Sequence, residues 1–335
     1  MENNLTKTKG NSKVSVIILT WNGIQHISNC LESVQKSSYL NYEIIVVDNG
    51  SKDGTPEMIS KKFPQVRLIL NKKNLGFTGG NNQGVKQAKG DVFFLLNDDT
   101  KIHPDLISVL VQELESSSQI GIVGPKIYFM PASSADGSEP DKIWFAGGKI
   151  DWSKSDSYHL GKNLTDRDLS GDSKKEVDFI TGCALMIKRE VVDKVGLFDN
   201  KLFAFYEDAD LCQKAKKAGY QVIYIPFGGV WHIKSATASR VFLDDLKSQM
   251  GRAGLMGRTM IVFKMIARYL FSATRQKGRH YRNRFIFFMR HAPFKHKITF
   301  LIRFIFIFTP QFLWSVVYQT LLSLIKIAYK FNKND

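Results

Sequence analysis

The stretch DVFFLLNDDT, residues 91–100, decides the fold of this chain. Its apolar run from Phe93 to Leu96 predicts a strand that is buried on both faces, as strands of parallel sheets are. The run ends in Asn97, Asp98 and Asp99. Neighbouring carboxylates repel each other and burial disfavours their charge, so a bound cation would make them tolerable at the tip of a buried strand. Capping of the following helix, by an aspartate or by the threonine after them, explains the same residues without a ligand.

Strand and helix signals alternate on both sides of that stretch. Strands are predicted at 14–22, 42–50, 66–71 and 91–100, helices at 24–36, from Thr55 onward and at 80–89, and further strands and helices within 177–196 and 208–226. Thr55 followed by Pro56 is typical of a helix start. This order predicts an α/β fold with a doubly wound, mostly parallel sheet and flanking helices. Ligands of such sheets lie beyond the carboxyl ends of the strands.

Charge divides the chain into a neutral part and a basic part. Residues 1–233 hold 28 Lys and Arg against 28 Asp and Glu, and residues 234–335 hold 19 against 3. The net charge of +16 therefore comes from the C-terminal part alone. We predict a disordered tail at 1–12, an α/β domain at 13–235 with an insertion at 131–178, and a basic, apolar, amphipathic helical region at 236–335.

The basic region contains two long apolar segments, residues 255–271 and 298–330. Arg and Lys alternate there with aromatic and aliphatic runs, which is typical of helices that lie on an anionic membrane surface. A nucleic-acid-binding region would interleave basic with polar residues instead, so we expect no nucleic acid partner. Two alternatives stay open. One is a membrane span by the uncharged residues 304–325, which Pro310 and Gln311 interrupt, and the other is packing on the α/β domain or on a second copy in a homodimer.

Two further features indicate the cellular compartment. The N-terminal residues MENNLTKTKGNSK are polar and lack the apolar core of a secretory signal. The three cysteines, Cys30, Cys183 and Cys212, are odd in number and far apart, which favours a reducing compartment over a disulfide framework. With membrane-binding helices, these features predict a peripheral protein at the cytoplasmic face of the cell membrane.

A glycine-rich stretch, NKKNLGFTGGNNQG at residues 71–84, precedes a predicted helix. Glycines let the backbone approach a ligand closely, and the helix N-terminus that follows favours an anion. The stretch is neither a GxGxxG fingerprint nor a Walker A motif. By itself it is weak evidence for a phosphate site.

Two motifs near the end of the α/β domain contain further candidate side chains. FYEDADLC, residues 205–212, places Glu207, Asp208 and Asp210 at a helix start. Acidic residues in a first turn usually interact with the helix dipole, but the aromatic residues before them predict a partly desolvated pocket in which a carboxylate acts as a base. His232 ends a predicted strand in VWHIKS, where it is either a metal ligand or an ordinary polar residue.

The order of these motifs resembles that of the inverting family 2 glycosyltransferases, which have the GT-A fold. The motifs VSVIILTWN, VVDNGSKDGT, NLGFTGGNN, LLNDDT, FYEDADLC and VWH follow one another as in that family. Within the family, the chain is most similar to the rhamnosyltransferase-like branch, and IWFAGGKID and VDFITGCALMIKRE also look like that branch. The resemblance covers Val14 to Ser235, and the set of motifs is more specific than any one of them.

The resemblance implies a role for each matching position. A nucleotide sugar would contact the strand ends and the glycine-rich stretch, through Thr20, Asn22, Asp48, Asn49, Asn74, Gly76, Gly79, Gly80, Asn97 and Asp98. Asp99 and His232 would hold Mg²⁺ or Mn²⁺, and Asp208, beside Glu207, would be the catalytic base. The family's DxD motif starts with Asn97 here, so we expect Asp98 to face the ribose and Asp99 to bind the metal.

The implied reaction is transfer of a sugar from a nucleoside diphosphate donor to a hydroxyl group of a polyprenyl-linked or cell-envelope glycan, by an enzyme of the hexosyltransferase type. The branch suggests thymidine diphosphate rhamnose as donor, and hexose or galactofuranose donors fit the same residues. A dinucleotide-dependent oxidoreductase would carry its glycine fingerprint after the first strand, where TWNG stands instead. A sugar nucleotidyltransferase is the alternative from another class, and it would need a basic residue near the attacked phosphate.

Overall fold

A computed structural model describes residues 12–130, 142–233, 275–311 and 314. The chain divides into two compact units. Unit 1 comprises Met1–Asp151 and Asp156–Ile233, and unit 2 comprises Trp152–Ser155 and Lys234–Asp335. The domain boundaries predicted from composition stay predictions, because the tail up to residue 11 and residues 234–274 lie outside the described ranges.

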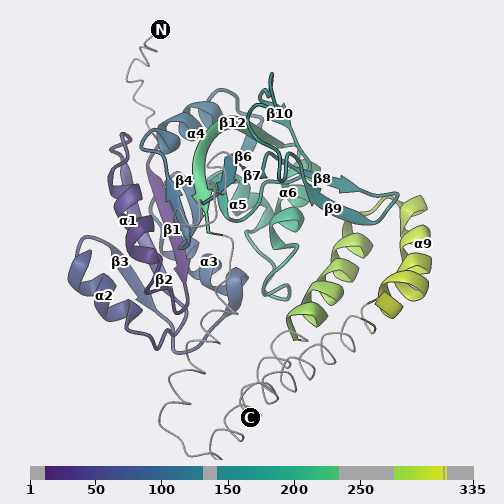
Figure 1. The fold of residues 1–335 in the computed structure, drawn as a ribbon, viewed down its shortest axis with the longest axis horizontal. Coiled ribbons are helices and arrows are strands. Elements are labelled where there is room, and N and C mark those ends of the chain that lie inside the picture. Colours follow the sequence, from purple (N-terminus) through teal and green to yellow (C-terminus); the bar gives the residue numbers. More distant parts are fainter. Residues whose placement is uncertain (1–11, 131–141, 234–274, 312–313, 315–335) are drawn as a thin grey trace, which may run out of the picture. The chain divides into compact units, whose positions relative to one another are not determined.

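Unit 1 is built on one large sheet with helices on both faces (Figure 1). The strand order is β10-β12-β6-β11-β4-β1-β2-β3, and β5 and β7 pair with β12 and β6. The strands are β1 (Val14–Thr20), β2 (Tyr42–Asp48), β3 (Arg67–Leu70), β4 (Val92–Asn97), β5 (Thr100–Ile102), β6 (Ile120–Phe129), β7 (Ile143–Phe145), β10 (Lys175–Glu176), β11 (Ala184–Lys188) and β12 (Gln221–His232). The core strands β1, β2 and β4 are almost wholly buried, as their apolar runs predict.

The sheet is mostly parallel, as predicted. Strand β1 pairs in parallel with β2 and β4, β2 pairs in parallel with β3, and β6 with β12. Strand β11 is antiparallel to both β4 and β6, so β4 and β6 point the same way. The carboxyl ends of β1, β2, β4, β6 and β12 therefore lie at one edge, and the start of β11 lies at that edge too.

The helices of unit 1 follow the predicted order with differences at their starts, and the first of them begins at Ile27 rather than at residue 24. They are α1 (Ile27–Gln35), α2 (Thr55–Lys62), α3 (Gly76–Gln87), α4 (Leu106–Glu115), α5 (Arg189–Val195) and α6 (Glu207–Lys217). Helix α3 begins at Gly76, so the glycine-rich stretch forms its first turns rather than a loop before it. Glycine is needed there for close packing, because a Cβ on Gly84 would lie 2.5 Å from Ile17 Cγ2 of β1. Helix α2 is capped by Gly54, whose φ is +88°, and Thr55 is already helical.

The insertion contributes β7, β10 and a separate hairpin to unit 1. Strands β8 (Gly148–Asp151) and β9 (Asp156–His159) pair as an antiparallel hairpin. Strand β7 extends the large sheet beside β6, and β10 extends it beside β12. The described part of the insertion therefore adds to the sheet on the side of β12.

The C-terminal part of unit 2 is helical where the structure describes it, whereas Trp152–Ser155 form a turn. Residues 275–291 form one helix, α9 (Phe294–Arg303) follows it, and η1 (Phe304–Phe308), a π-helix, continues α9. Phe288 and Phe300 are buried and stack with ring centroids 5.1 Å apart. The predicted helical C-terminal segment is confirmed for these residues.

The two apolar segments predicted to contact a membrane are described only in part. Residues 255–271 and most of 304–325 lie outside the described ranges, so a span or an interfacial helix at those positions stays a prediction. Among the helices that are described, none combines the length and the apolar character needed to cross a bilayer.

Candidate active site

The carboxyl ends of strands β1, β2, β4 and β12 bring the predicted residues to one edge of the sheet in unit 1. Thr20 at the end of β1 is in register with Asp48 at the end of β2, and β1 is in register with β4 up to Asn97. His232 is the last residue of β12 and is in register with Thr100 of β5, which follows β4 closely. Residues far apart in the sequence therefore share this edge.

Asp48 is buried and uses half of its carboxylate in the turn after β2. Its Oδ1 accepts hydrogen bonds from the backbone N–H groups of Gly50, at 3.0 Å, and Ser51, at 2.9 Å. Its Oδ2 is also buried and has no hydrogen-bond partner among the residues described. Because a buried carboxylate oxygen is costly to leave unpaired, Oδ2 is an acceptor suited to a hydroxyl or N–H group of a ligand.

Asn49 and Asn74 join the end of β2 to the start of α3. Asn49 donates from Nδ2 to the Gly76 carbonyl at 3.1 Å, and its Oδ1 accepts from Asn71 Nδ2 at 3.1 Å. Asn74 Oδ1 accepts from the Gly76 N–H at 2.8 Å. These bonds hold the first turn of α3, which contains the predicted Gly76, Gly79 and Gly80, beside the end of β2.

Asn22 and Asp53 connect the loops after β1 and β2. The Asn22 N–H donates to Ser51 Oγ at 2.7 Å, and its Oδ1 accepts from the Lys52 N–H at 2.9 Å. Asp53 Oδ2 accepts from the Ile24 N–H at 3.1 Å. The structure thus shows both side chains supporting the loops around Asp48.

Asp98 is bound to Thr20 across the ends of β4 and β1. The Thr20 hydroxyl donates to Asp98 Oδ2 at 2.5 Å, and any side chain at Gly23 would collide with both groups. Burial of the carboxyl group raises the pKa of Asp98 to about 7; the hydrogen bond from Thr20 opposes that shift and the charge of Asp99 adds to it. Asn97, one residue earlier, is held by its backbone N–H, which donates to the Cys183 carbonyl at 3.0 Å.

Asp99 and His232 face each other at the same edge. Asp99 Oδ1 lies 3.3 Å from His232 Nε2, and the Ile233 N–H donates to the Asp99 carbonyl at 3.0 Å. Asp99 Oδ1 and His232 Nδ1 are buried and have no hydrogen-bond partner among the residues described. Each side chain of the pair therefore has one buried polar atom whose hydrogen bonding is not satisfied by the described residues.

The donor atoms of this pair fit a divalent cation that is shared with phosphate. Two neighbouring ligands of an octahedral Mg²⁺, each about 2.1 Å from the ion, lie about 3 Å apart, which is close to the observed spacing. Over the described ranges, no cluster of three or more His, Cys, Asp or Glu side chains is placed to hold a metal. Magnesium sites commonly take one or two protein ligands and complete the shell with water and substrate phosphates, so the pair suffices only with such a substrate.

Glu207 and Asp208 begin helix α6 with different hydrogen bonding. Asp208 accepts from the Gly182 N–H at 3.1 Å and from the Ala209 N–H at 2.7 Å, whereas Glu207 Oε2 is buried without a partner among the described residues. Burial raises the pKa of both carboxyl groups, and repulsion from Asp208 raises that of Glu207 further. Since the amides stabilise the charged form of Asp208, we assign the carboxylate to Asp208 and the proton to Glu207 at neutral pH.

The loop before Asp208 packs on the glycine-rich start of α3. Phe203, Phe205 and Tyr206 have φ angles of 60°, 75° and 67°, a conformation that bulky residues rarely adopt and that is concentrated at functional sites. The Phe203 carbonyl accepts from the Thr78 N–H at 3.1 Å, and a Cβ on Gly76 would lie 2.5 Å from the Phe203 ring. This contact between the two predicted motifs was not evident from the sequence, where only the aromatic composition of the loop stood out.

Trp144 is a further residue of this edge that the sequence analysis did not select. Its ring centroid lies 4.6 Å from that of His232 and 4.8 Å from that of His159. Trp144 belongs to β7, which reaches β12 only through the pairing of both strands with β6. A single sequence gives no signal of such a pairing.

Comparison with known proteins identifies similar chains. A family model described as glycosyl transferase family 2 matches residues 15–196. An uncharacterized protein of Sinorhizobium fredii, y4gI, is 31% identical over 257 residues, which are 73% of this chain and 27% of that protein. The N-acetylglucosaminyl-diphospho-decaprenol L-rhamnosyltransferase of Mycobacterium tuberculosis is 25% identical over 272 residues, which are 72% of this chain and 87% of that enzyme.

A solved structure supports the fold. The crystal structure of GalNAc-T7 with UDP, GalNAc and Mn²⁺ matches 66% of this chain and 43% of its own, with a TM-score of 0.53 and 22% sequence identity. At that identity the match concerns the fold alone. The chain spans about a quarter of the length of the Sinorhizobium protein but most of the mycobacterial enzyme.

Proposed function

We propose that this chain, which belongs to glycosyl transferase family 2 and is a glycosyltransferase, moves a sugar from a nucleoside diphosphate to a hydroxyl group of a lipid-linked or cell-envelope glycan. The configuration at the anomeric carbon is inverted in the proposed reaction. One observation carries the proposal. Asp99 Oδ1 and His232 Nε2, whose 3.3 Å spacing suits two ligands of one cation, lie at the same sheet edge as the unpaired Asp48 Oδ2 and the start of β11 beside Asp208. Such an edge suits a nucleotide, a metal-bound diphosphate and a base together.

The donor would lie across the ends of β1, β2 and β4. Asp48 Oδ2 accepts a hydrogen bond from the nucleoside, and Asp98, already bound to Thr20, faces the ribose. Asp99 and His232 would hold Mg²⁺ or Mn²⁺, which would supply positive charge for the diphosphate. The positive end of the α3 dipole at Gly76 would favour the same negative charge. Support comes from GalNAc-T7, which has UDP and Mn²⁺ in its crystal structure.

Asp208 is the base of the proposed displacement. Its carboxylate takes the proton of the acceptor hydroxyl while that oxygen bonds to the anomeric carbon, and the bond from this carbon to the diphosphate breaks on the opposite face. The raised pKa of Asp208 makes it a stronger base than an exposed aspartate, and the Gly182 and Ala209 amides hold it in place. When bound, the cation neutralises the charge that develops on the leaving diphosphate.

The acceptor class and the donor sugar are proposed from the name of a relative. The name of the mycobacterial relative describes a rhamnosyl transfer to a diphospho-decaprenol sugar, which supports a polyprenyl-linked acceptor and a rhamnosyl donor here. Thymidine diphosphate is the nucleotide that the resemblance to the rhamnosyltransferase-like branch suggests. Hexose and galactofuranose donors fit the same residues. Gly182 and the insertion that carries Trp144 line the acceptor side in this proposal.

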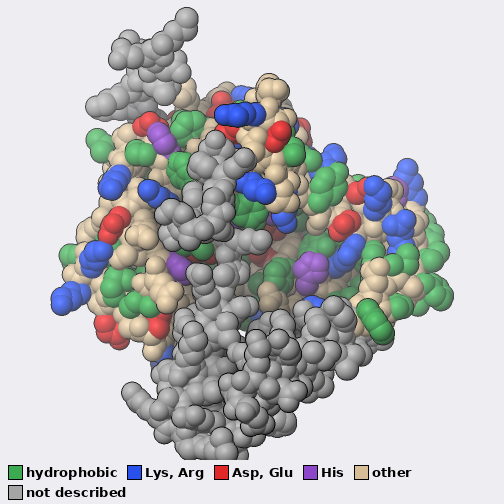
Figure 2. Space-filling model, viewed as in Figure 1, with side chains coloured by type: hydrophobic (Ala, Val, Ile, Leu, Met, Phe, Trp, Pro, Cys, Tyr) green, Lys and Arg blue, Asp and Glu red, His purple; other side chains and the backbone are tan. Residues whose placement is uncertain are grey.

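A membrane surface at the cytoplasmic face is the proposed location. In unit 2, Phe294, Ile298 and Ile302 follow one another at helical spacing on α9 and are 80%, 53% and 55% exposed. Lys295 and Lys297 lie on the same helix, and Figure 2 shows basic and apolar side chains together on the part of the molecule that carries α9. Exposed apolar rows next to basic residues suit insertion into an anionic leaflet.

A donor screen with Mn²⁺ tests the proposed reaction. The protein is incubated with single nucleotide sugars, and released nucleoside diphosphate is measured with and without Mn²⁺. Release that depends on Mn²⁺ and disappears in Asp99→Ala, but not in Asp193→Asn on the exposed side of α5, supports the proposal. Formation of pyrophosphate from a nucleoside triphosphate and a sugar phosphate would instead identify a sugar nucleotidyltransferase.

A further inference from the structure

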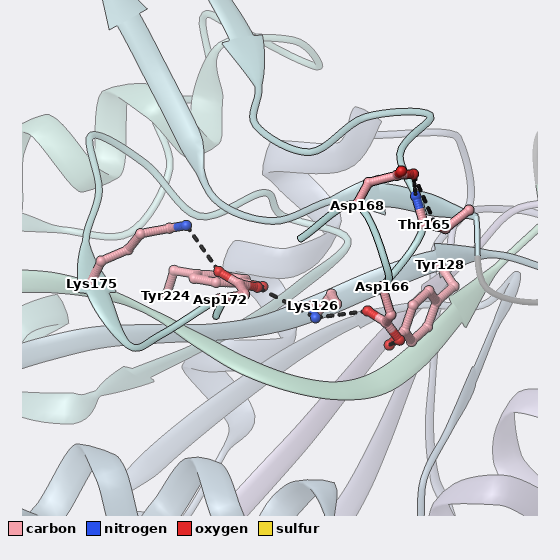
Figure 3. Close-up of polar contacts among 8 residues, drawn as sticks. All are labelled: Lys126, Tyr128, Thr165, Asp166, Asp168, Asp172, Lys175 and Tyr224. Atoms are coloured by element: carbon pink, nitrogen blue, oxygen red, sulfur yellow. Dashed lines mark hydrogen bonds and ion pairs between the residues drawn. The ribbon is translucent and has the colours of Figure 1, made fainter. Parts of the chain in front are cut away.

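A buried ionic cluster joins the insertion to the sheet of unit 1, and we call it the Lys126 cluster (Figure 3). Lys126 Nζ on β6 lies 2.8 Å from Asp166 Oδ1 and 3.3 Å from Asp172 Oδ2. The Tyr128 hydroxyl donates to Asp166 Oδ2 at 2.7 Å, and the Tyr224 hydroxyl donates to Asp172 Oδ2 at 2.6 Å. The cluster consists of Lys126, Tyr128, Asp166, Asp172, Lys175 and Tyr224.

The Lys126 cluster connects the insertion to strands β6 and β12 through ion pairs and hydrogen bonds. The side chains of Lys126 and Asp172 are 8% and 5% exposed, and buried charges are stable only when they are paired and hydrogen-bonded. Asp166, whose side chain is 46% exposed, is the more accessible end of the cluster. The residues between Thr165 and Lys175 are thus tied to β6 and β12 by oriented polar contacts (Figure 3).

Tyr128 also touches β12 close to the candidate metal ligand. It is in register with Trp231, the neighbour of His232, and the two rings stack at 6.1 Å with an angle of 29°. A Cβ on Gly228 would collide with the Tyr128 ring and hydroxyl, so this ring lies directly on the Gly228 backbone. One side chain therefore contacts the insertion, Gly228 and Trp231.

The segment of β12 under Tyr128 is irregular. In its pairing with β6, the register shifts between Ile225 and Gly228 and again between Gly228 and Val230. Extra residues in a strand change which face the following side chains point to, because side chains alternate with a period of two. The register after the second shift decides whether His232 points toward Asp99, and Tyr128 packs on both sides of that shift.

We propose that Tyr128 is a positioning residue for His232. The hydrogen bond that the Tyr128 hydroxyl donates to Asp166 keeps the Tyr128 ring against Gly228 and Trp231. This contact fixes the shifted register in which His232 Nε2 meets Asp99 Oδ1. The consequence for metal binding rests on the proposed function, whereas the effect on the position of His232 does not. The insertion thus contributes to the metal site through Tyr128 without supplying a ligand.

Histidine side-chain NMR of the metal-free protein tests the positional effect. His232 is assigned with His232→Gln, and its ¹H–¹⁵N imidazole signals are compared in Tyr128→Phe and Tyr224→Phe. Each variant loses the one hydrogen bond that its tyrosine hydroxyl donates to an aspartate of the Lys126 cluster. Tyr224 is the control because it lies before the irregular segment of β12 that follows Ile225. We expect the His232 signals to shift in Tyr128→Phe and to keep their wild-type positions in Tyr224→Phe. Unchanged His232 signals in Tyr128→Phe, or equal shifts in both variants, would overturn the inference.

Two further measurements complete the experiment. Asp166→Ala removes the same hydrogen bond by deleting its acceptor, so we expect it to shift the His232 signals as Tyr128→Phe does. It tests the inference independently if Tyr128→Phe does not fold. Mn²⁺ affinity in the presence of nucleoside diphosphate, followed by electron paramagnetic resonance, falls about tenfold in either variant and not in Tyr224→Phe. If the wild-type protein bound no Mn²⁺, the proposed function would fail, and the NMR comparison alone would still decide the role of Tyr128.

Discussion

The backbone N–H of Gly182 donates a hydrogen bond to Asp208 Oδ2 at 3.1 Å. Gly182 lies just before β11, the strand that runs against its neighbours β4 and β6. The start of β11 therefore meets the carboxyl ends of the parallel strands, and it brings an amide donor to the carboxylate that we assign as the base. A Cβ at Gly182 would lie about 3 Å from the Phe77 ring, so glycine lets this segment pack against Phe77 while its amide meets Asp208.

Asp208→Asn tests this assignment. The asparagine keeps the size of the side chain but cannot accept the acceptor proton, so we expect turnover to fall about a hundredfold or more while donor affinity is retained. Turnover is measured as nucleoside diphosphate release and affinity by calorimetry. Asp193→Asn is the control, an exposed aspartate on α5 that leaves both quantities unchanged. Near wild-type turnover in Asp208→Asn would remove Asp208 from the mechanism.

Gly76→Ala tests the contact between the start of α3 and the aromatic loop. Gly76 has a φ of +79° and lies under the Phe203 ring, whereas Gly171 has a φ of +86° and has open space around its missing Cβ. Gly171→Ala therefore reports the backbone cost alone, about 1 kcal/mol in the free energy of unfolding.

We expect Gly76→Ala to lose more stability than Gly171→Ala, and also to weaken donor binding because the first turn of α3 must move away from Phe203. Urea unfolding and donor titration measure the two effects. Equal losses of stability in the two variants, with unchanged donor affinity, would show that the Phe203 contact has no energetic importance.

His159 predicts a pH dependence of stability. Burial among Trp144, Phe145 and Phe179 lowers the pKa of His159 to about 4. Between the ordinary histidine pKa and that value, the unfolded chain binds a proton that the folded chain does not. The free energy of unfolding should therefore fall as the pH is lowered from about 6.5 to 4, by up to about 3 kcal/mol from this residue.

Urea unfolding of wild type and His159→Gln at several pH values measures this contribution. Glutamine does not titrate, so the difference between the two proteins should change over that pH window and be constant above it. A difference that stays constant over the whole range would contradict the lowered pKa.

The core of the fold was predictable because its strands are long apolar runs bounded by polar residues. The apolar run from Phe93 to Leu96, bounded by polar residues, indicates a buried strand, and the alternation of such runs with helices indicates a parallel sheet. The direction of β11 was not predictable, because the apolar run from Ala184 to Ile187 reads the same for either direction. The start of α3 was misplaced because glycines that look like a loop are needed for close packing on β1.

The candidate site was predictable as a set of residues but not as a set of contacts. Chain order showed that Asp98 and Asp99 follow a buried strand, but the turn between β4 and β5 decides that Asp98 meets Thr20 and Asp99 meets His232. The roles assigned to these residues remain predictions. Tyr128 and Trp144 were missed because their contacts depend on how the insertion pairs with β6.

Membrane binding of unit 2 is tested by removing exposed apolar side chains from α9. Phe294 and Ile298 lie one turn apart and are 80% and 53% exposed, so substitution by glutamine removes apolar surface without opening a core. If both side chains insert into the bilayer, Phe294→Gln with Ile298→Gln should weaken binding to vesicles containing anionic lipid by about tenfold or more, since a buried side chain of this size contributes roughly 1.5–3 kcal/mol.

Leu70→Gln is the matched control, because Leu70 is 63% exposed on β3 of unit 1 and its substitution should have no effect on vesicle binding. Vesicle sedimentation at low and high salt measures the binding, and the contribution of the basic residues predicts weaker binding at high salt. Equal binding of the double variant and the Leu70 control would show that this face of α9 does not contact the membrane, and binding that then persists would have to come from another part of the chain.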